Sequence, residues 1–351
     1  MKRRIISIIS VIIAVLISLF AVGCTGCAGC AGDTSIMFNN NFLGGGSATE
    51  AQVGYKEVLT YDVRFKESYS GIEKNLNTND YFDYNFSNGS YKITFSSLAS
   101  LPEGVDMQFS LGEGVSNYYY LKTEFNIDAW YKVAGEYADG GIDLNGGKLY
   151  KDSIVSEVYF LPSGNSFAPI KAITTQKQST LYISSTPSVN YQTYQFTTIY
   201  KAGTYTTTTT YNDATNQTTS NYSVKSAIDN TQLLFAIRNI SVDLDSTFVL
   251  PTVSPAYSSP QELAIKNKSE ETLSKSIEGL GDNLEIPVSN YMIYRNADKN
   301  TGCPQYAKIQ KATSNNSKSL LIEYSAALMP CDTPFAFMGV LVYSLSSVNY
   351  N

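Results

Sequence analysis

The chain has 351 residues and is acidic, with 25 Lys and Arg against 31 Asp and Glu and a formal net charge of −6. This balance argues against nucleic acid as a partner, because binding to phosphates needs Lys and Arg. The chain has no histidine, which excludes Ser-His-Asp and Cys-His catalysis and imidazole ligation of zinc or haem. Charged residues make up 16%, while tyrosine occurs 27 times, a composition typical of strands with neutral polar outer faces.

The N-terminus combines three basic residues at 2–4, an apolar run at 5–22 and the pair Gly23-Cys24. A basic start, an apolar core and a small residue before a cleavage point are the parts of an export signal. An uncleaved membrane helix is the alternative, because about 18 apolar residues can span a bilayer. Under both interpretations the basic residues stay inside and the rest of the chain lies outside the cytoplasm.

The sequence Ala-Val-Gly-Cys at 21–24 resembles the lipobox of bacterial lipoproteins, although that family prefers Leu where Ala21 stands. The resemblance implies cleavage before Cys24 and a diacylglyceryl thioether on its sulfur. The protein would then be lipid-anchored at the cell membrane, with its domain on the extracytoplasmic side. The membrane, reached through the lipid, would be its first partner.

Three segments follow from this interpretation: a signal peptide at 1–23, a lipid attachment site and flexible spacer at 24–52, and a single β-rich domain at 53–351. The spacer is rich in Gly, Asn and Ser, as flexible linkers are. Cys24, Cys27 and Cys30 could in principle ligate a metal cluster. The tract has no hydrophobic shell to exclude solvent, so we predict neither a metal nor a cofactor.

Period-two alternation dominates the domain. The first predicted strand begins at Tyr55. Its apolar residues share one parity, and these are Tyr55, Leu59, Tyr61, Val63 and Phe65, while the other parity is polar. Asn88-Gly89, between apolar runs at 81–86 and 91–95, predicts a hairpin with a type I′ turn. The other predicted strands lie at 105–111, 118–127, 129–137, 154–161, 170–175, 248–250, 262–266, 288–295, 305–311, 320–327 and 337–346. They predict a mainly β fold with a large antiparallel sheet.

Two details of this sheet can be predicted from the closing strands. The segment 337–346 is the most apolar, so we expect it near the centre of the sheet. Asn315-Asn316, near the midpoint between 305–311 and 320–327, should close a hairpin.

A Tyr- and Thr-rich hairpin is expected around Ala202-Gly203. Aromatic residues alternate with Thr on both sides of this turn, at Tyr194, Phe196, Tyr200, Tyr205 and Tyr211. The face could be a platform for sugar rings, since flat amphipathic side chains pack well on them. Alternatively, it is core on one side and a solvated Thr-rich surface on the other.

One buried helix is predicted near 229–240. Asp229 and Gln232 have the spacing of a capping box, and Leu233, Leu234 and Ile237 then recur at helical intervals. A polar second candidate lies at 269–280 and could be a loop with one helical turn.

Cys303 and Cys331 are the two cysteines of the domain. In an oxidising compartment they are expected to form a disulfide. Free thiols are the alternative, because the organism could live without oxygen or oxidant enzymes.

Motifs for chemistry are weak, and we assign no catalytic residue. Asn296, Asp298, Asn300 and Gly302 faintly resemble a calcium loop, but the loop has one carboxylate and no distal Glu. It is better explained as a hairpin loop. Two carboxylate pairs could in principle support glycosidase chemistry, but solvated loop acids are the simpler interpretation. These pairs are Asp139 with Asp143, and Asp243 with Asp245.

The order of parts resembles a poorly characterised family of bacterial extracytoplasmic proteins built as an open β half-barrel around a helix. The matching pieces are LTYDVRF at 59–65, SEVYFLP at 156–162, the Tyr-rich hairpin, DNTQLLFAIRNI at 229–240, LIEYSAAL at 321–328 and MGVLVYSL at 338–345. The resemblance implies that the sheet curves into an open half-barrel around the helix. This architecture is similar to periplasmic lipoprotein carriers, whose concave sheet holds acyl chains, and the family has no established activity.

Three classes of function remain. The first is a surface-exposed, lipid-anchored, non-catalytic binding protein that cradles an apolar or glycan ligand, with a deep apolar pocket beside the helix. The second is a structural or protein-interaction component of the cell envelope, with a large exposed face instead of a pocket. The third is a hydrolase with two carboxylates about 5 to 10 Å apart in a cleft. The sequence assigns no ligand-binding residue and no oligomeric state.

Overall fold

The computed structural model describes residues 53–65, 70–74, 81–109, 117–134, 149–163, 166–182, 188–211, 214–222, 227–239, 242–255, 259–295, 305–310, 319–327 and 340–350. The export signal, Cys24, Cys303, Cys331 and the Asn315-Asn316 turn lie outside these ranges, so the roles assigned to them stay predictions. Within the ranges, no helix is long and apolar enough to cross a membrane.

The described strands form one open, curved sheet of sixteen strands, in which every pairing between named strands except that of β10 with β11 is antiparallel. The strands are β1 (Lys56–Phe65), β2 (Ser70–Lys74), β3 (Tyr81–Leu98), β4 (Tyr118–Ala134), β5 (Leu149–Ser163), β6 (Ser166–Tyr182), β7 (Ser188–Lys201), β8 (Thr204–Tyr211), β9 (Ala214–Asn221), β10 (Ile228–Asp229), β11 (Thr247–Val253), β12 (Gln261–Ile277), β13 (Gly281–Arg295), β14 (Gln305–Gln310), β15 (Leu320–Ala327) and β16 (Val340–Tyr350). The predicted fold class is therefore confirmed.

The first and last strands of the domain are neighbours in the middle of the sheet. The order is β10-β11-β12-β13-β14-β15-β16-β1-β3-β4-β5-β6-β7-β8-β9, and β2 pairs with β3 outside this path. The central position of β16, which the apolar segment 337–346 predicts, is thus confirmed. In β1 the predicted alternation also holds, because Leu59, Tyr61 and Val63 are buried.

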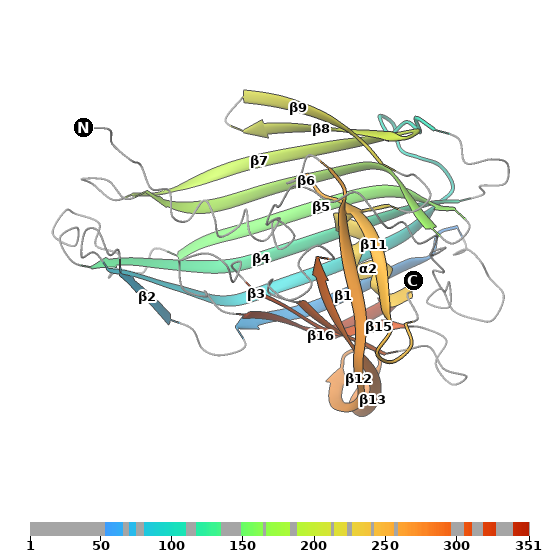
Figure 1. Ribbon diagram of the computed structural model, residues 1–351. Helices are drawn as coiled ribbons and strands as arrows, with labels where there is room; N and C mark the ends of the chain where they lie inside the picture. Colours follow the sequence, from blue (N-terminus) through green and yellow to red (C-terminus); the bar gives the residue numbers. More distant parts are fainter. Residues whose placement is uncertain are drawn as a thin grey trace.

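The sheet curves so that the hairpin of β12 and β13 returns to β16. Figure 1 shows β12 and β13 running steeply to the direction of the long strands β3 to β7, with the tip of their hairpin on the side of the molecule where β16 lies. At its tip, the Glu278 amide donates to the Ser346 carbonyl at 2.9 Å, and the Val348 amide donates to the Glu278 carbonyl at 2.9 Å. Gly279 follows with a φ of 87°, which L side chains rarely adopt.

The predicted helix is present and begins at the predicted capping box. It consists of three short parts, η4 (Asn230–Gln232), α2 (Leu233–Ala236) and η5 (Ile237–Asn239). Asp229 caps it by accepting a hydrogen bond from the Thr231 amide at 2.8 Å, and Gln232 accepts one from the Asp229 amide at 2.8 Å. The helical segment is buried on the inner face of the sheet, as predicted.

Phe235 is the residue through which α2 packs on three strands. Its ring stacks on Phe95 of β3 with a centroid distance of 4.8 Å. It also contacts Phe160 of β5 at 5.9 Å and Phe167 of β6 at 5.5 Å. All four rings are buried, so the helix is fixed against the sheet mainly by aromatic packing.

Three local predictions are wrong. Asn88-Gly89 makes no turn, because β3 continues through it and a bulge between Ser87 and Ser90 absorbs the irregularity. The segment 269–280 is not helical, since most of it belongs to β12, paired along β13. No strand forms in the described part of 105–111, where Gln108 makes only an isolated bridge.

The failure at Gly89 has a steric cause. Gly89 pairs with Val63 across the strands, and a β-carbon at this position would lie 2.8 Å from the Val63 β-carbon. Glycine at position 89 therefore allows β1 and β3 to approach closely. Glycine has this role in sheets as well as in turns, so its presence alone did not identify a turn.

Candidate functional site

A pocket of about 100 Å³ lies between the inner face of the sheet and the helical segment. Its described lining comes from six strands, the start of the helix and one loop residue. These residues are Tyr91, Thr123, Phe125, Ile154, Ser156, Thr174, Asn230, Thr231, Leu233, Leu234, Pro255, Tyr324 and Tyr343. Enclosed pockets for drug-sized ligands span roughly 300 to 1,000 Å³, so this pocket suits one end of a longer molecule.

One wall of the pocket is a cluster of aromatic rings. Tyr343 packs edge-on against Tyr91, and its ring centroid lies 5.4 Å from those of both Tyr91 and Tyr324. The Phe125 ring, on β4, lies 6.1 Å from the Tyr343 ring. Burial raises the pKa of Tyr91, Tyr324 and Tyr343 well above the usual value, so this wall is uncharged at neutral pH.

The hydroxyl groups on the wall formed by β3 to β6 are largely paired with each other. Thr174 Oγ1 donates to Ser156 Oγ at 2.9 Å. The Tyr91 hydroxyl is hydrogen-bonded to Thr123, which partly offsets the effect of burial on the pKa of Tyr91. Each of these bonds occupies one donor and one acceptor site, so the hydroxyls are less polar toward a ligand than unpaired ones would be.

The helical side of the pocket is positioned by Asp229. Besides capping the helix, Asp229 accepts a hydrogen bond from the Tyr200 hydroxyl at 2.5 Å, and Tyr200 is fully buried on β7. Burial raises the pKa of Asp229, and the hydrogen bonds from Tyr200 and Thr231 act in the opposite direction. The cap therefore ties the pocket residues Asn230 and Thr231 to the strand that carries Tyr200.

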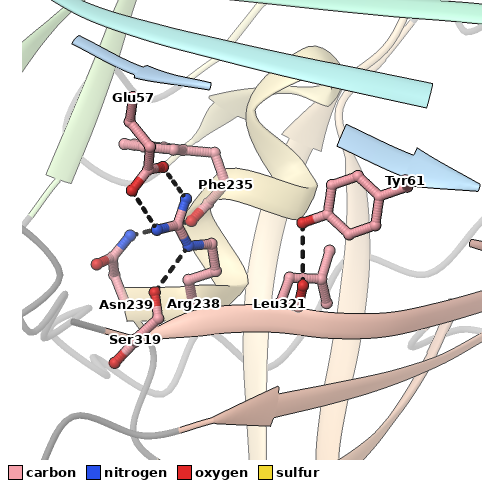
Figure 2. Close-up of polar contacts among 7 residues, drawn as sticks. All are labelled: Glu57, Tyr61, Phe235, Arg238, Asn239, Ser319 and Leu321. Atoms are coloured by element: carbon pink, nitrogen blue, oxygen red, sulfur yellow. Dashed lines mark hydrogen bonds and ion pairs between the residues drawn. The ribbon is translucent and has the colours of Figure 1, made fainter. Parts of the chain in front are cut away.

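The far end of the helix is held by a buried ion pair, drawn in Figure 2. Arg238 donates from Nη1 and Nη2 to the two carboxylate oxygens of Glu57 at 2.6 and 3.0 Å, and from Nε to the Ser319 carbonyl at 3.0 Å. Burial alone would lower the pKa of Arg238, but the charge and hydrogen bonds of Glu57 raise it overall. This pair joins the helix to β1, so both ends of the helix are fixed.

Asp152 is a second buried acid, located on β5 outside the pocket lining. Its carboxylate accepts hydrogen bonds from the Ser179 amide at 2.8 Å and the Ser179 hydroxyl at 2.9 Å. Burial raises the pKa of Asp152 to about 7, while Ser179 and the charge of Lys177 act to lower it. The sequence patterns did not single out Asp152, because an isolated Asp in a strand carries no motif.

The carboxylate pairs proposed from the sequence do not form a cleft in the described residues. Asp243 and Asp245 are both exposed, and Asp245 lies 3.8 Å from the Lys266 amine. For this pair the interpretation as solvated loop acids is confirmed. Asp139, Asp143 and the 296–302 loop lie outside the described ranges. No group of three metal-ligating side chains occurs within those ranges.

The Tyr-rich hairpin forms as expected, as β7 and β8 around Gly203, whose φ is 77°. At the turn end, Tyr200 and Tyr205 are fully buried, which confirms the core interpretation there. At the other end, the half-buried rings of Tyr194 and Tyr211 stack at a centroid distance of 4.5 Å and an interplanar angle of 13°. Only this end could offer aromatic surface to a sugar.

Comparison with known proteins gives a single weak likeness to report. No family model matches the chain, and no curated protein matches it in sequence. The crystal structure of a β-barrel-like protein of Domain of Unknown Function DUF1849 from Brucella abortus is similar, with a TM-score of 0.44 and 7% identity. The likeness covers 86% of this chain and 99% of that chain. A TM-score of this size supports no conclusion about function.

Proposed function

We propose that this domain is a non-catalytic binding protein that takes the apolar end of a ligand into the pocket beside the helix. The observation that carries the proposal is the pocket itself, which is lined mainly by carbon and lies against Leu233 and Leu234. Pockets with few polar groups among apolar and aromatic side chains are typical of small-molecule sites. The volume of about 100 Å³ suits part of a chain, with the rest of the ligand outside.

The lining also favours binding over hydrolysis. None of the described lining residues is Asp, Glu, Lys or Arg, whereas glycosidases need two carboxyl groups about 5 to 10 Å apart. The pocket hydroxyls have no general base beside them among those residues, so they are weak nucleophiles.

We further propose that the domain acts at a membrane, held by lipid on Cys24. The support is the export segment followed by Gly23-Cys24. Mass spectrometry of the membrane-bound protein should find Cys24 as the N-terminal residue, carrying a diacylglyceryl thioether. A protein that keeps residues 1–23 and carries no lipid on Cys24 would make the uncleaved membrane helix the better explanation.

The pocket can be tested on the protein without its signal peptide. Lipids that copurify are extracted and identified by mass spectrometry, and 1-octanol is titrated by calorimetry. Leu234→Trp should fill the pocket and abolish both signals. Leu244→Trp is the matched control, because Leu244 is 57% exposed and does not line the pocket. Equal binding by both variants would exclude this pocket as the site.

An envelope interaction protein is the second candidate, supported by β9. This strand ends the sheet order and is almost entirely exposed. Its sequence, ATNQTTSN, has no charge or proline, although natural edge strands usually carry such residues to prevent pairing. The absence of copurified lipid and of octanol binding, together with a protein captured through β9, would favour this function.

A further inference from the structure

The strand β9 ends the sheet with an exposed edge. Within the described residues it pairs only with β8, and seven of its eight residues are exposed. Figure 1 shows it at the outermost position of the sheet. A terminal strand leaves alternate backbone N–H and C=O groups pointing away from its neighbour, and these groups can pair with a further strand. The opposite end of the sheet order offers no such edge, because β10 is two buried residues.

Side-chain hydrogen bonds form a ladder between one face of β8 and the same face of β9. Its three rungs join Thr206 Oγ1 and Thr219 Oγ1 at 3.0 Å, Gln217 Nε2 and Thr208 Oγ1 at 3.4 Å, and Thr210 Oγ1 and Thr215 Oγ1 at 3.4 Å. Cross-strand pairs of this kind stabilise a sheet. On β9 the ladder uses Thr215, Gln217 and Thr219, which are spaced two residues apart.

These three residues of β9 read the same in both directions, with Gln217 between two threonines. A second copy of β9 can run antiparallel beside the first, with Gln217 on a two-fold axis. Thr215 of each copy then lies opposite Thr219 of the other, and the two Gln217 side chains face each other. Residues directly opposite in an antiparallel pair point to the same face of the sheet. The ladder of hydroxyls and amides therefore continues from one copy into the next.

The charge distribution also favours a second copy of this strand over a charged partner. The chain has a net charge of −6, yet residues 178–224 contain one basic and one acidic residue, Lys201 and Asp213. No residue of β9 is charged. Like charges directly opposite each other destabilise a strand pair. Two copies of this acidic chain avoid that cost when they meet at β9.

We infer that two copies of this chain associate through β9, antiparallel and about a two-fold axis at Gln217, so that their sheets become one. Two-fold dimers are the commonest homo-oligomers. A single pair of short strands buries less than the roughly 1,600 Å² of a standard interface, so the dimer dissociates on dilution. The inference goes beyond the proposed function, since no residue of β9 belongs to the described pocket lining.

Sedimentation velocity measures the association, with a reducing agent present to exclude chance disulfides. The protein without its signal peptide should pass from monomer to dimer as its concentration rises. Thr215→Lys combined with Thr219→Lys places like charges opposite each other at two rungs. Thr215→Lys combined with Thr219→Glu is the matched control, because it changes the same positions and places opposite charges there. The first variant should dimerise at least about tenfold more weakly than the second.

Cysteine cross-linking locates the axis in protein from which Cys24, Cys27 and Cys30 have been removed. Gln217→Cys should form an intermolecular disulfide with copper phenanthroline, because opposite residues in an antiparallel pair have Cα atoms about 5 Å apart, within reach of a disulfide. Thr208→Cys is the control, since Thr208 pairs with Gln217 from the next strand inward. Its two copies would lie about 14 Å apart, three strand spacings, and should not link.

Three results would each overturn the inference. The first is a monomer at every concentration, and the second is equal dimerisation by the two double variants. The third is cross-linking of Thr208→Cys as readily as of Gln217→Cys. A monomer whose β9 captures a different protein would assign the edge to that protein instead. Circular dichroism and the unfolding midpoint establish that each variant folds, and ligand binding in the pocket is measured separately.

Discussion

Arg238 and Glu57 form a two-pronged ion pair in which both side chains are almost fully buried, with 0% and 1% of the side-chain surface exposed. The residues are 181 positions apart, and the pair joins the end of the helical segment to the central strand β1. Asn239 strengthens the same end by donating from Nδ2 to the Phe235 carbonyl at 3.0 Å. The helix that lines the pocket is thus anchored by charge at one end and by its cap at the other.

Glu57→Gln should destabilise the domain by about 3 to 5 kcal/mol, because it leaves a buried guanidinium without a counter-charge. The free energy of unfolding can be measured with urea. The double variant Glu57→Leu with Arg238→Met should be far less damaged, because it removes both charges. If it is as unstable as Glu57→Gln, the cost comes from packing and not from the unpaired charge.

Asp152 should make the domain less stable as the pH rises. Its pKa is about 7 in the folded state and about 3.9 when unfolded, so between these values the folded state binds more protons. The stabilisation is present below about pH 4 and is lost as the pH rises to about 7. The free energy of unfolding should fall by at most about 1.4 kcal/mol per pH unit because of Asp152.

Asp152→Asn isolates this effect, since the amide keeps an oxygen for the Ser179 amide but does not titrate. The difference in unfolding free energy between the variant and the unmodified protein should shift in favour of the variant between pH 4 and 7. Asp229, whose pKa is also raised, contributes equally to both proteins. If the difference in unfolding free energy between the two proteins does not change with pH, the raised pKa of Asp152 is wrong.

Much of the sheet could be predicted from the sequence because one face is buried and the other is not. The alternation of Leu59, Tyr61 and Val63 reflects this directly, and so does the apolar strand β16. The helix could be predicted because Asp229 and Gln232 are local signals of a capped start. Such patterns depend only on neighbours along the chain.

The wrong predictions arise where the pattern of neighbouring residues does not determine the secondary structure. Most of β12 between 268 and 276 is exposed, so its alternation is lost and its strand conformation depends on pairing with β13. The pocket was expected beside the helix and is present. The aromatic wall of the pocket could not be predicted from the sequence. Tyr91 and Tyr343 come into contact only because of the register in which β3, β1 and β16 pair.

The cysteine pair outside the described ranges gives a chemical prediction. In protein from which Cys24, Cys27 and Cys30 have been removed, a thiol assay under unfolding, non-reducing conditions should find no reactive group, because Cys303 and Cys331 are expected to be bridged. The bridge would stabilise the domain by roughly 3 kcal/mol in the chain-entropy model. Two reactive thiols would exclude it.

Gly279 should control how the β12–β13 hairpin joins β16. A β-carbon here would lie 2.1 Å from the Val348 carbonyl oxygen, so Gly279→Ala must displace the backbone. Gly203→Ala is the control, with a φ of 77° but no atom within 4 Å of the added carbon. It should cost only about 1 to 2 kcal/mol for the left-handed conformation.

The readout that separates the two variants is hydrogen exchange at the Glu278 and Val348 amides, which make the two hydrogen bonds at the hairpin tip. Gly279→Ala should speed exchange at both amides by well over tenfold, because each bond opens when the tip moves. Gly203→Ala should leave both unchanged, since it lies at the turn between β7 and β8. Unchanged protection in Gly279→Ala would mean that the contact with Val348 is not what positions the hairpin.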